Sequence, residues 1–288
     1  MTARTIDQIH CIDTNQYGLA KRGAAYVIEA ARVCLVETGT PKALPQLKAA
    51  LEQREPAYVF VTHVHLDHAG AAGGLAAAFP SSTIVAHPRA IRHLADPSRL
   101  VEGVRAASPD LFPLYGEPVP IPEDRLYPAA DGERFVLGGE MIVEALHTPG
   151  HAPHHLCFFE RSTRTLFTGD AVGNHRVPVD VPLTVPPRFD PSAALETLDR
   201  LSELGAERLA FTHFGLADDP PARLLAGYAD EIRAWFERIR ALASKRSPEE
   251  VVAEILADSR YSGIEQADRF SIEMCVRGAL LSIGPDPA

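Results

Sequence analysis

Four side chains that can bind metal lie within the segment THVHLDHAG, residues 62–70. The apolar run before this segment predicts a buried strand, and the small residues after it predict the start of a helix. Because alternate side chains of a strand share a face, His63 and His65 can reach one ion, while the turn carries Asp67 and His68 toward a second position. A chance cluster of polar surface residues is the alternative, but a strand end rarely carries three imidazoles without a function. The segment therefore predicts part of a metal site.

Three further apolar runs of the sequence also end in a potential metal ligand. One leads through Thr148-Pro149-Gly150 to His151, another ends at Asp170, and a third ends at His213. The strand-end donors are then His63, His65, Asp67, His68, His151, Asp170 and His213. Seven nitrogen and oxygen donors without a thiolate suit two adjacent divalent ions that share a carboxylate. The expected cofactors are two divalent metal ions, with Zn favoured over Fe and Mn.

Length and composition limit the classes of protein that the chain can belong to. It has 288 residues, of which 46% are hydrophobic and 23% charged, and no apolar run approaches the roughly 20 residues that span a bilayer. The N-terminal segment lacks the apolar stretch of an export signal, so we expect a cytoplasmic protein without a membrane partner. A formal charge of -10 disfavours nucleic acid as a partner without excluding it, because a local basic groove can coexist with a negative total charge. The expected partner is a small-molecule substrate. The four cysteines are widely spaced, which predicts neither disulfides nor a thiolate zinc site.

The apolar periodicity predicts an α/β protein in which strands and helices alternate. Strands are expected at 24–30, 33–37, 57–62, 83–87, 135–137, 141–146, 156–160, 165–170 and 208–212. Helices are expected at 41–55, 69–79 and 190–204. Residues 88–128 are rich in proline and lack strong periodicity, so we expect a functional loop or lid with one short helix at 98–107.

The C-terminal part of the chain has a different character. Helical periodicity covers 220–243, 248–256 and 266–281, and no strand pattern is visible there. We therefore expect an α/β domain at 1–215 and a helical extension at 216–288. The apolar faces of these helices either pack against the α/β domain or form a homodimer.

Together, the motifs resemble those of the metallo-β-lactamase-fold superfamily. The HxHxDH signature stands at 63–68, TPGH at 148–151, GD at 169–170 and a last strand-end histidine at His213. The resemblance covers residues 24 to 215 in the same order and spacing. It implies a four-layer αββα sandwich with the site at one edge of the sheets.

The resemblance also implies a role for each donor. The first ion would be bound by His63, His65 and His151. The second would be bound by Asp67, His68 and His213. Asp170 would bridge the ions, a hydroxide between them would be the nucleophile, and Asp67 would also take up a proton from it.

Several positions depart from known subgroups of the superfamily. One class of true β-lactamases has Cys where Asp170 stands, and the di-iron flavoprotein relatives have Glu where His65 stands. Lactonases that resemble this pattern carry Tyr at the position of Gly173, and residues 174–177 differ from the Gly-Cys-Gly-Arg-type segment of glutathione thioesterases. The sequence therefore assigns no close substrate subgroup.

The favoured function is a binuclear metallohydrolase of a small ester, thioester or lactone. A phosphodiesterase is an alternative, because the same metal pair stabilises phosphoryl oxygens. A second alternative is a mononuclear-iron dioxygenase of sulfur substrates that uses only the first-ion residues. A sensor or scaffold without catalysis is disfavoured, since no ligand is missing.

Other histidines near the motifs are weaker candidates. His175 follows Asp170 by five residues and is a candidate substrate-binding residue, which could orient a substrate or protonate a leaving group. The alternative is an exposed loop histidine. His154 and His155 are expected to support the site or the fold rather than bind metal.

Overall fold

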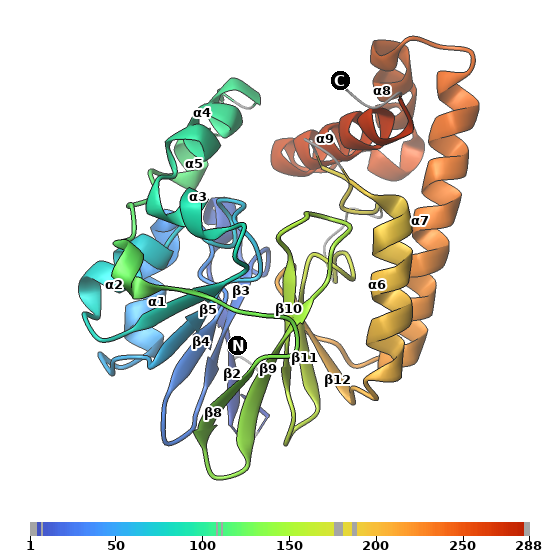
Figure 1. The fold of residues 1–288 in the computed structure, drawn as a ribbon. Helices are drawn as coiled ribbons and strands as arrows, with labels where there is room; N and C mark the ends of the chain where they lie inside the picture. The colour runs from blue at the N-terminus through green and yellow to red at the C-terminus, as the bar shows by residue number, and fades with distance from the viewer. Residues whose placement is uncertain are drawn as a thin grey trace.

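Two β-sheets pack face to face, and helices cover the outer face of each sheet (Figure 1). The structure is a computed structural model that describes residues 5–6, 8–107, 109–110, 112–175, 181–185 and 189–284. The expected αββα architecture with a C-terminal helical region is confirmed.

Within the described residues, the first sheet holds seven strands in sequence order. They are β1 (Thr5–Ile6), β2 (Ile9–Asp13), β3 (Ala24–Ile28), β4 (Cys34–Val36), β5 (Tyr58–Phe60), β6 (Thr83–Ala86) and β7 (Leu126–Pro128). Strands β1 to β4 are antiparallel neighbours, whereas β4 to β7 run parallel. The parallel pairs require crossover connections, and the helices of this half lie in them.

The second sheet has the order β13-β12-β11-β10-β9-β8. Its strands are β8 (Arg134–Gly138), β9 (Met141–His147), β10 (Leu156–Glu160), β11 (Thr165–Gly169), β12 (Arg208–Phe211) and β13 (Gly215–Leu216). Only β11 and β12 form a parallel pair among these strands of the described chain. Helix α6 connects them.

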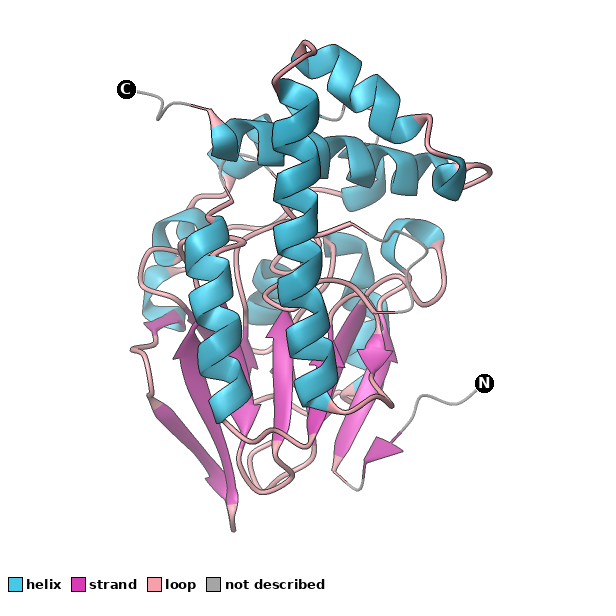
Figure 2. Ribbon diagram, turned by 90° about the vertical axis from the view of Figure 1, so that its right-hand side faces the viewer, coloured by secondary structure: helices cyan, strands magenta, loops and turns pink. Residues whose placement is uncertain are grey.

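Helices form the two outer layers and extend beyond the strand ends. On the side of the first sheet lie α1 (Leu44–Ala50), α2 (Ala72–Ala78), α3 (Ile91–Ala95), α4 (Ser98–Ala107) and α5 (Phe112–Tyr115). On the other side lie α6 (Pro191–Glu203), α7 (Pro221–Ala243), α8 (Pro248–Leu256) and α9 (Gln266–Ile283). The described part of the chain also forms the 3-10 turns η1 (Gln16–Gly18), η2 (Pro41–Ala43), η3 (Glu123–Arg125) and η4 (Ser259–Tyr261). Helices α6 and α7 stand side by side across the second sheet (Figure 2).

Strand β3 shows how the sequence builds the layers. Ala24, Tyr26 and Ile28 belong to the cluster between the sheets, whereas Ala25 and Val27 belong to the cluster under the helices. Side chains alternate along a strand, so a strand that is covered on both faces is apolar at every position. This explains the continuous apolar run in the sequence.

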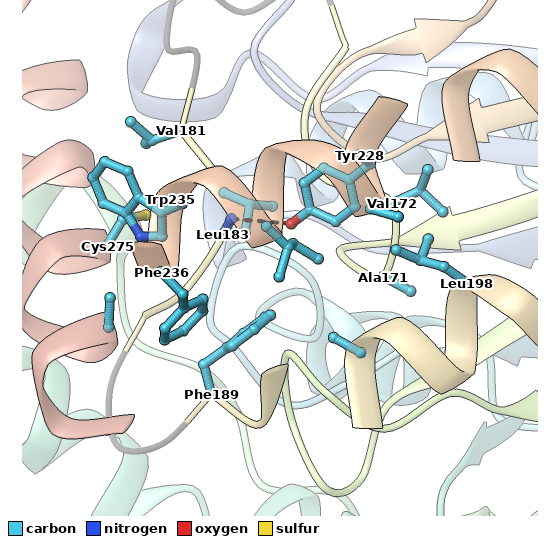
Figure 3. Packing of buried hydrophobic residues seen from close by; sticks show 14 of the residues in the cluster. Ala171, Val172, Val181, Leu183, Phe189, Leu198, Tyr228, Trp235, Phe236 and Cys275 are labelled. Carbon is cyan, nitrogen blue, oxygen red and sulfur yellow. Dashed lines mark hydrogen bonds between the residues drawn. The ribbon is translucent and has the colours of Figure 1, made fainter. Parts of the chain in front are cut away.

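A third hydrophobic cluster joins the second sheet to the C-terminal helices (Figure 3). Trp235 and Tyr228 of α7 lie in it, and the Leu183 backbone N–H donates to the Tyr228 hydroxyl at 3.1 Å. The cluster contains residues on both sides of the expected domain boundary at 215/216. That boundary stays a prediction, but the two parts share a core.

Residues 88–128 differ from the expected loop with one helix. The segment contains α3, α4, α5 and η3, followed by β7. Pro97 precedes α4 and Pro113 lies in the first turn of α5. Proline is tolerated at these positions because no helical hydrogen bond needs its missing N–H. The prolines therefore separate short helices. Among the described residues, no helix has the length and apolar character needed to cross a membrane.

Candidate metal centre

The structure brings the seven predicted donors together at one edge of the two sheets. Four of them follow β5 of the first sheet, and the others follow strands of the second sheet. His151 lies in the connection from β9 to β10, Asp170 follows β11, and His213 comes two residues after β12. Residues far apart in sequence thus meet because the sheets pack face to face.

The first donor group consists of three imidazoles and a carboxylate. One ligand atom each of His63, His65, His151 and Asp170 lies within 4.8 Å of the others. The His65 Nδ1 atom is 2.9 Å from His63 Nε2 and 3.1 Å from His151 Nε2. Asp170 Oδ2 lies 3.3 Å from His151 Nε2. Three ring nitrogens and one oxygen therefore surround a common point.

The second group lies on the other side of Asp170. Ligand atoms of Asp67, His68 and His213 lie within 4.8 Å of one another. Asp170 Oδ1 is 3.3 Å from His68 Nε2 and 3.6 Å from His213 Nε2. The two oxygens of Asp170 thus face different donor groups, as a bridging carboxylate requires.

Two buried polar atoms of the centre lie 3.3 Å apart but have no hydrogen-bond partner among the described residues. His68 Nε2 and Asp170 Oδ1 form no hydrogen bond within the described part of the chain. A buried polar atom without a partner is costly, and a cation between these atoms would satisfy both. The donor set and its spacing therefore fit divalent metal ions.

The ring nitrogens that face away from the centre contact protein groups. The His68 Nδ1–H group donates to buried Glu37 Oε2 at 3.1 Å. The corresponding partners of three other histidines are Thr62 Oγ1 for His63 (3.0 Å), Leu183 O for His151 (2.8 Å) and Arg22 O for His213 (3.1 Å). Such contacts fix the tautomer and the ring orientation of metal-binding histidines. Glu37 ends the apolar run that forms β4, which is the same signal that identified the donors, whereas no sequence signal marks Arg22.

The protein environment separates the pKa values of these groups. Burial lowers the pKa of His63, His65 and His151, which keeps these rings neutral, as metal binding requires. Burial also disfavours a charged His68, but the carboxylates of Asp170 and Glu37 outweigh it and raise the His68 pKa well above its usual value. Positive charge on the His68 ring is therefore balanced by the buried carboxylates of Asp170 and Glu37.

Two glycines allow close packing behind the donors. Gly150 has φ +139°, and a Cβ atom there would lie 2.5 Å from Ala194 Cα of α6. Gly169 has φ +48°, and a Cβ atom there would lie 2.5 Å from His155 Nε2. Other residues would be strained in both places. Gly150 of TPGH and Gly169 of GD thus allow the backbone conformation that places His151 and Asp170 in the donor groups.

His155 and His175 contact the backbone near the donors. His155 accepts a hydrogen bond from the Asp170 N–H at 3.1 Å, and its Nδ1 is 2.8 Å from Thr148 Oγ1, so it supports the site as expected. The His175 backbone pairs with His213 and Phe214, and its ring lies 5.1 Å from the Phe211 ring. Its role in substrate binding stays a prediction.

A cavity of about 570 Å³ opens onto the donors. Helices α4 and α9, which face each other in Figure 1, and the turn η1 contribute its walls. The apolar wall residues include Leu19, Leu100, Val104, Leu183, Val185, Phe270 and Met274. The irregular segment 88–128 thus helps to enclose the site, in line with the expected lid. The contribution of α9 was not predicted, because helical periodicity does not show where a helix packs.

An ion pair connects α9 to the metal centre. Arg22 Nη2 lies 2.7 Å from Asp268 Oδ2, and both side chains are mostly buried. The carbonyl oxygen of the same Arg22 accepts the hydrogen bond from His213 Nδ1. The C-terminal helix is therefore linked through one residue to a donor of the second group.

An αββα sandwich with two donor groups that share a carboxylate has the fold and the site of a metallohydrolase. A sequence profile described as "Metallo-beta-lactamase superfamily" matches residues 20–213, more than half of the chain. The chain belongs to this superfamily.

Individual relatives share parts of the chain. "Metallo-beta-lactamase fold-containing protein ST1585" of Sulfurisphaera tokodaii is 30% identical over 162 residues, which cover 55% of this chain and 60% of that protein. "Atrochrysone carboxyl ACP thioesterase AacuM" of Aspergillus aculeatus is 31% identical over 118 residues, which cover 41% of this chain and 28% of that protein. The chain thus spans less than two thirds of the length of these curated relatives.

Solved structures show the same fold. The crystal structure of archaeal ST1585 from Sulfolobus tokodaii has a TM-score of 0.73 at 22% identity, with 96% of this chain and 100% of that chain covered. TTHA1429 of Thermus thermophilus, described as a metallo-beta-lactamase family protein, has a TM-score of 0.69 at 20% identity, with coverage of 96% and 92%. Both alignments extend over the C-terminal helical region as well as the sandwich.

Proposed function

We propose that this metallohydrolase cleaves a small carboxylic ester, thioester or lactone with two divalent ions, for which zinc is our first choice. The observation that carries the proposal is the pair of donor groups that share Asp170 at the polar end of an apolar cavity. When bound, the ions would lower the pKa of a coordinated water and polarise the carbonyl group.

The residues of the chain contribute binding, orientation and proton acceptance. Gln16 Nε2 donates a hydrogen bond to Asp67 Oδ2 at 2.9 Å, which fixes this carboxylate beside the second donor group. Asp67 can then accept the proton of the attacking water. The apolar walls exclude bulk water and bind the hydrocarbon part of a substrate.

The cavity supports a carbonyl substrate rather than a phosphodiester. Among the described wall residues, the permanent positive charges belong to Arg22 and Arg99. Arg22 is already paired with Asp268, and Arg99 is exposed at α4. A phosphodiester keeps its negative charge throughout and would favour a more basic pocket. The formal charge of -10 supports the same choice.

Relatives support the thioester within this substrate class. Two partially matched proteins carry the name atrochrysone carboxyl ACP thioesterase. Thioesters and esters are attacked at the same kind of carbonyl carbon, so one donor arrangement suits both. A cytoplasmic location and a homodimer remain part of our proposal.

A substrate panel tests the proposal. We expect the zinc-loaded protein to hydrolyse 4-nitrophenyl hexanoate, S-hexanoyl-N-acetylcysteamine or γ-decalactone at least about 100-fold faster than bis-4-nitrophenyl phosphate, because the pocket is apolar and weakly cationic. Initial rates at equal substrate concentration, with chelated protein as the control, give this ratio.

Two results would contradict the carbonyl assignment. Activity on bis-4-nitrophenyl phosphate alone would favour the phosphodiesterase. One iron per chain together with oxygen consumption on a glutathione persulfide would favour the sulfur dioxygenase.

A further inference from the structure

Two tyrosine hydroxyl groups meet in the wall of the cavity. The Tyr17 hydroxyl donates to the Tyr115 oxygen at 2.7 Å, and the two rings pack edge to face with centroids 5.2 Å apart. Tyr17 comes from η1 and Tyr115 from the end of α5. Both line the same cavity as Asp67 and His213. The pair is thus part of the pocket that contains the metal centre.

The hydrogen count leaves one donor for a ligand. Each phenol has one O–H group and can also accept hydrogen bonds. Tyr17 uses its hydrogen on Tyr115, and the Tyr115 hydroxyl donates no hydrogen bond within the described part of the chain. A hydroxyl that accepts one hydrogen bond becomes a stronger donor for the next. Tyr115 therefore has an activated O–H group at the cavity wall.

Both phenols keep their protons at neutral pH. Burial in the cavity wall raises the pKa of Tyr17 and Tyr115. A neutral phenol can donate a hydrogen bond, whereas a phenolate cannot. The environment thus maintains the donor form.

The backbone that carries Tyr17 is strained. Asn15 has φ 49° and Tyr17 has φ 58°, in the left-handed region that non-glycine residues rarely adopt. Strained backbone of this kind occurs preferentially at functional sites. The intervening Gln16 bonds Asp67, so one strained turn serves both the centre and the tyrosine pair. On the other side, Lys42 Nζ donates to Pro113 O in α5 at 2.6 Å.

We propose that Tyr115 is a catalytic residue that donates a hydrogen bond to the carbonyl oxygen of the substrate, and that Tyr17 positions it. This inference rests on the proposed hydrolysis of an ester, thioester or lactone. As the carbonyl carbon is attacked, its oxygen gains negative charge, so a fixed donor stabilises the transition state more than the substrate. No proton needs to leave Tyr115 in this role.

Removal of each hydroxyl group tests the inference. In the zinc-loaded protein, we expect Tyr115→Phe to lower kcat for 4-nitrophenyl hexanoate about 100-fold with little change in KM, the effect of losing one transition-state donor. Tyr17→Phe retains the Tyr115 hydroxyl but removes the hydrogen bond that holds it in one orientation. A smaller loss of about 10-fold in kcat is therefore expected. Tyr127→Phe is the matched control, because Tyr127 is 40% exposed and bonds Glu133 away from the cavity.

Product binding gives a measurement independent of turnover. Hexanoate binding followed by calorimetry should weaken about fivefold in Tyr115→Phe and remain unchanged in Tyr127→Phe, since one hydrogen bond to a carboxylate is lost. Metal content and Tm should match the wild type in all three variants.

The outcomes separate this inference from the proposed function. Wild-type kcat and wild-type hexanoate affinity in Tyr115→Phe would overturn the inference while leaving hydrolysis intact. A full effect in Tyr115→Phe with none in Tyr17→Phe would overturn the positioning role. If the wild type hydrolyses no carbonyl substrate, the proposed function fails. In that case, unchanged hexanoate binding in Tyr115→Phe would also exclude Tyr115 as a hydrogen-bond donor to an oxygen of the ligand.

Discussion

Replacement of Asp170 by Asn is expected to remove the bridge between the two donor groups. Asn has the same shape as Asp, but an NH₂ group replaces one of the two carboxylate oxygens. That group would face either His68 and His213 or His63 and His151, and it cannot bind a cation. Loss of a residue that only hydrogen-bonds to a metal ligand costs about 10- to 100-fold in metal affinity or activity. Loss of Asp170, a ligand that both ions would share, should therefore cost at least about 100-fold in kcat/KM. The second ion should be lost during gel filtration in metal-free buffer.

The matched control is Asp199→Asn, an exposed position on α6. It should keep the metal content and the rate of the wild type. The prediction is checked by metal analysis and by hydrolysis of 4-nitrophenyl hexanoate on the same samples. Full metal content and full activity in Asp170→Asn would refute the bridging role.

Replacement of Glu37 by Gln is expected to weaken the second site selectively. Glu37 accepts the hydrogen bond from His68 Nδ1 and is 1% exposed. The neutral amide of Gln no longer stabilises positive charge on the His68 ring and no longer makes this ring a stronger base. Affinity for the second ion should therefore fall about 10- to 100-fold. Competition with a chromogenic chelator measures the two affinities separately.

Glu203→Gln serves as the control, because Glu203 is exposed on α6. An equal loss of both ions in Glu37→Gln would instead indicate general unfolding of the centre, which circular dichroism and the Tm would reveal. Unchanged affinity for the second ion would contradict the assignment of His68 as its ligand.

The donors could be found from the sequence because each ends an apolar run. His63 and His65 have the alternate spacing of strand residues, although β5 already ends at Phe60 and both histidines lie in the loop that follows it. Gly150 and Gly169 mark turns at which only glycine fits. Strand ends within a sheet layer meet at one edge, so the sequence alone is enough to combine the four separate motifs into one site.

The supporting residues could not be found in this way. Gln16 and Tyr115 reach the site from a 3-10 turn and from the end of a short helix, whose positions depend on packing between layers. Glu37 directly follows β4, but its contact with His68 also depends on how the chain packs. The ion pair between Arg22 and Asp268 joins residues 246 positions apart. No local pattern encodes such contacts. The proline-rich segment 88–128 shows the same limit, since prolines between short helices resemble prolines in a loop.

The seven donors are the basis of the whole account, and metal analysis of the purified protein tests them most directly. Elemental analysis after dialysis against trace zinc should give about two ions per chain, since two donor groups share one carboxylate. Chelation should lower the Tm, because ions that bind only the folded state stabilise it. A protein that retains less than one transition-metal ion per chain under these conditions, with an unchanged Tm after chelation, would contradict the account.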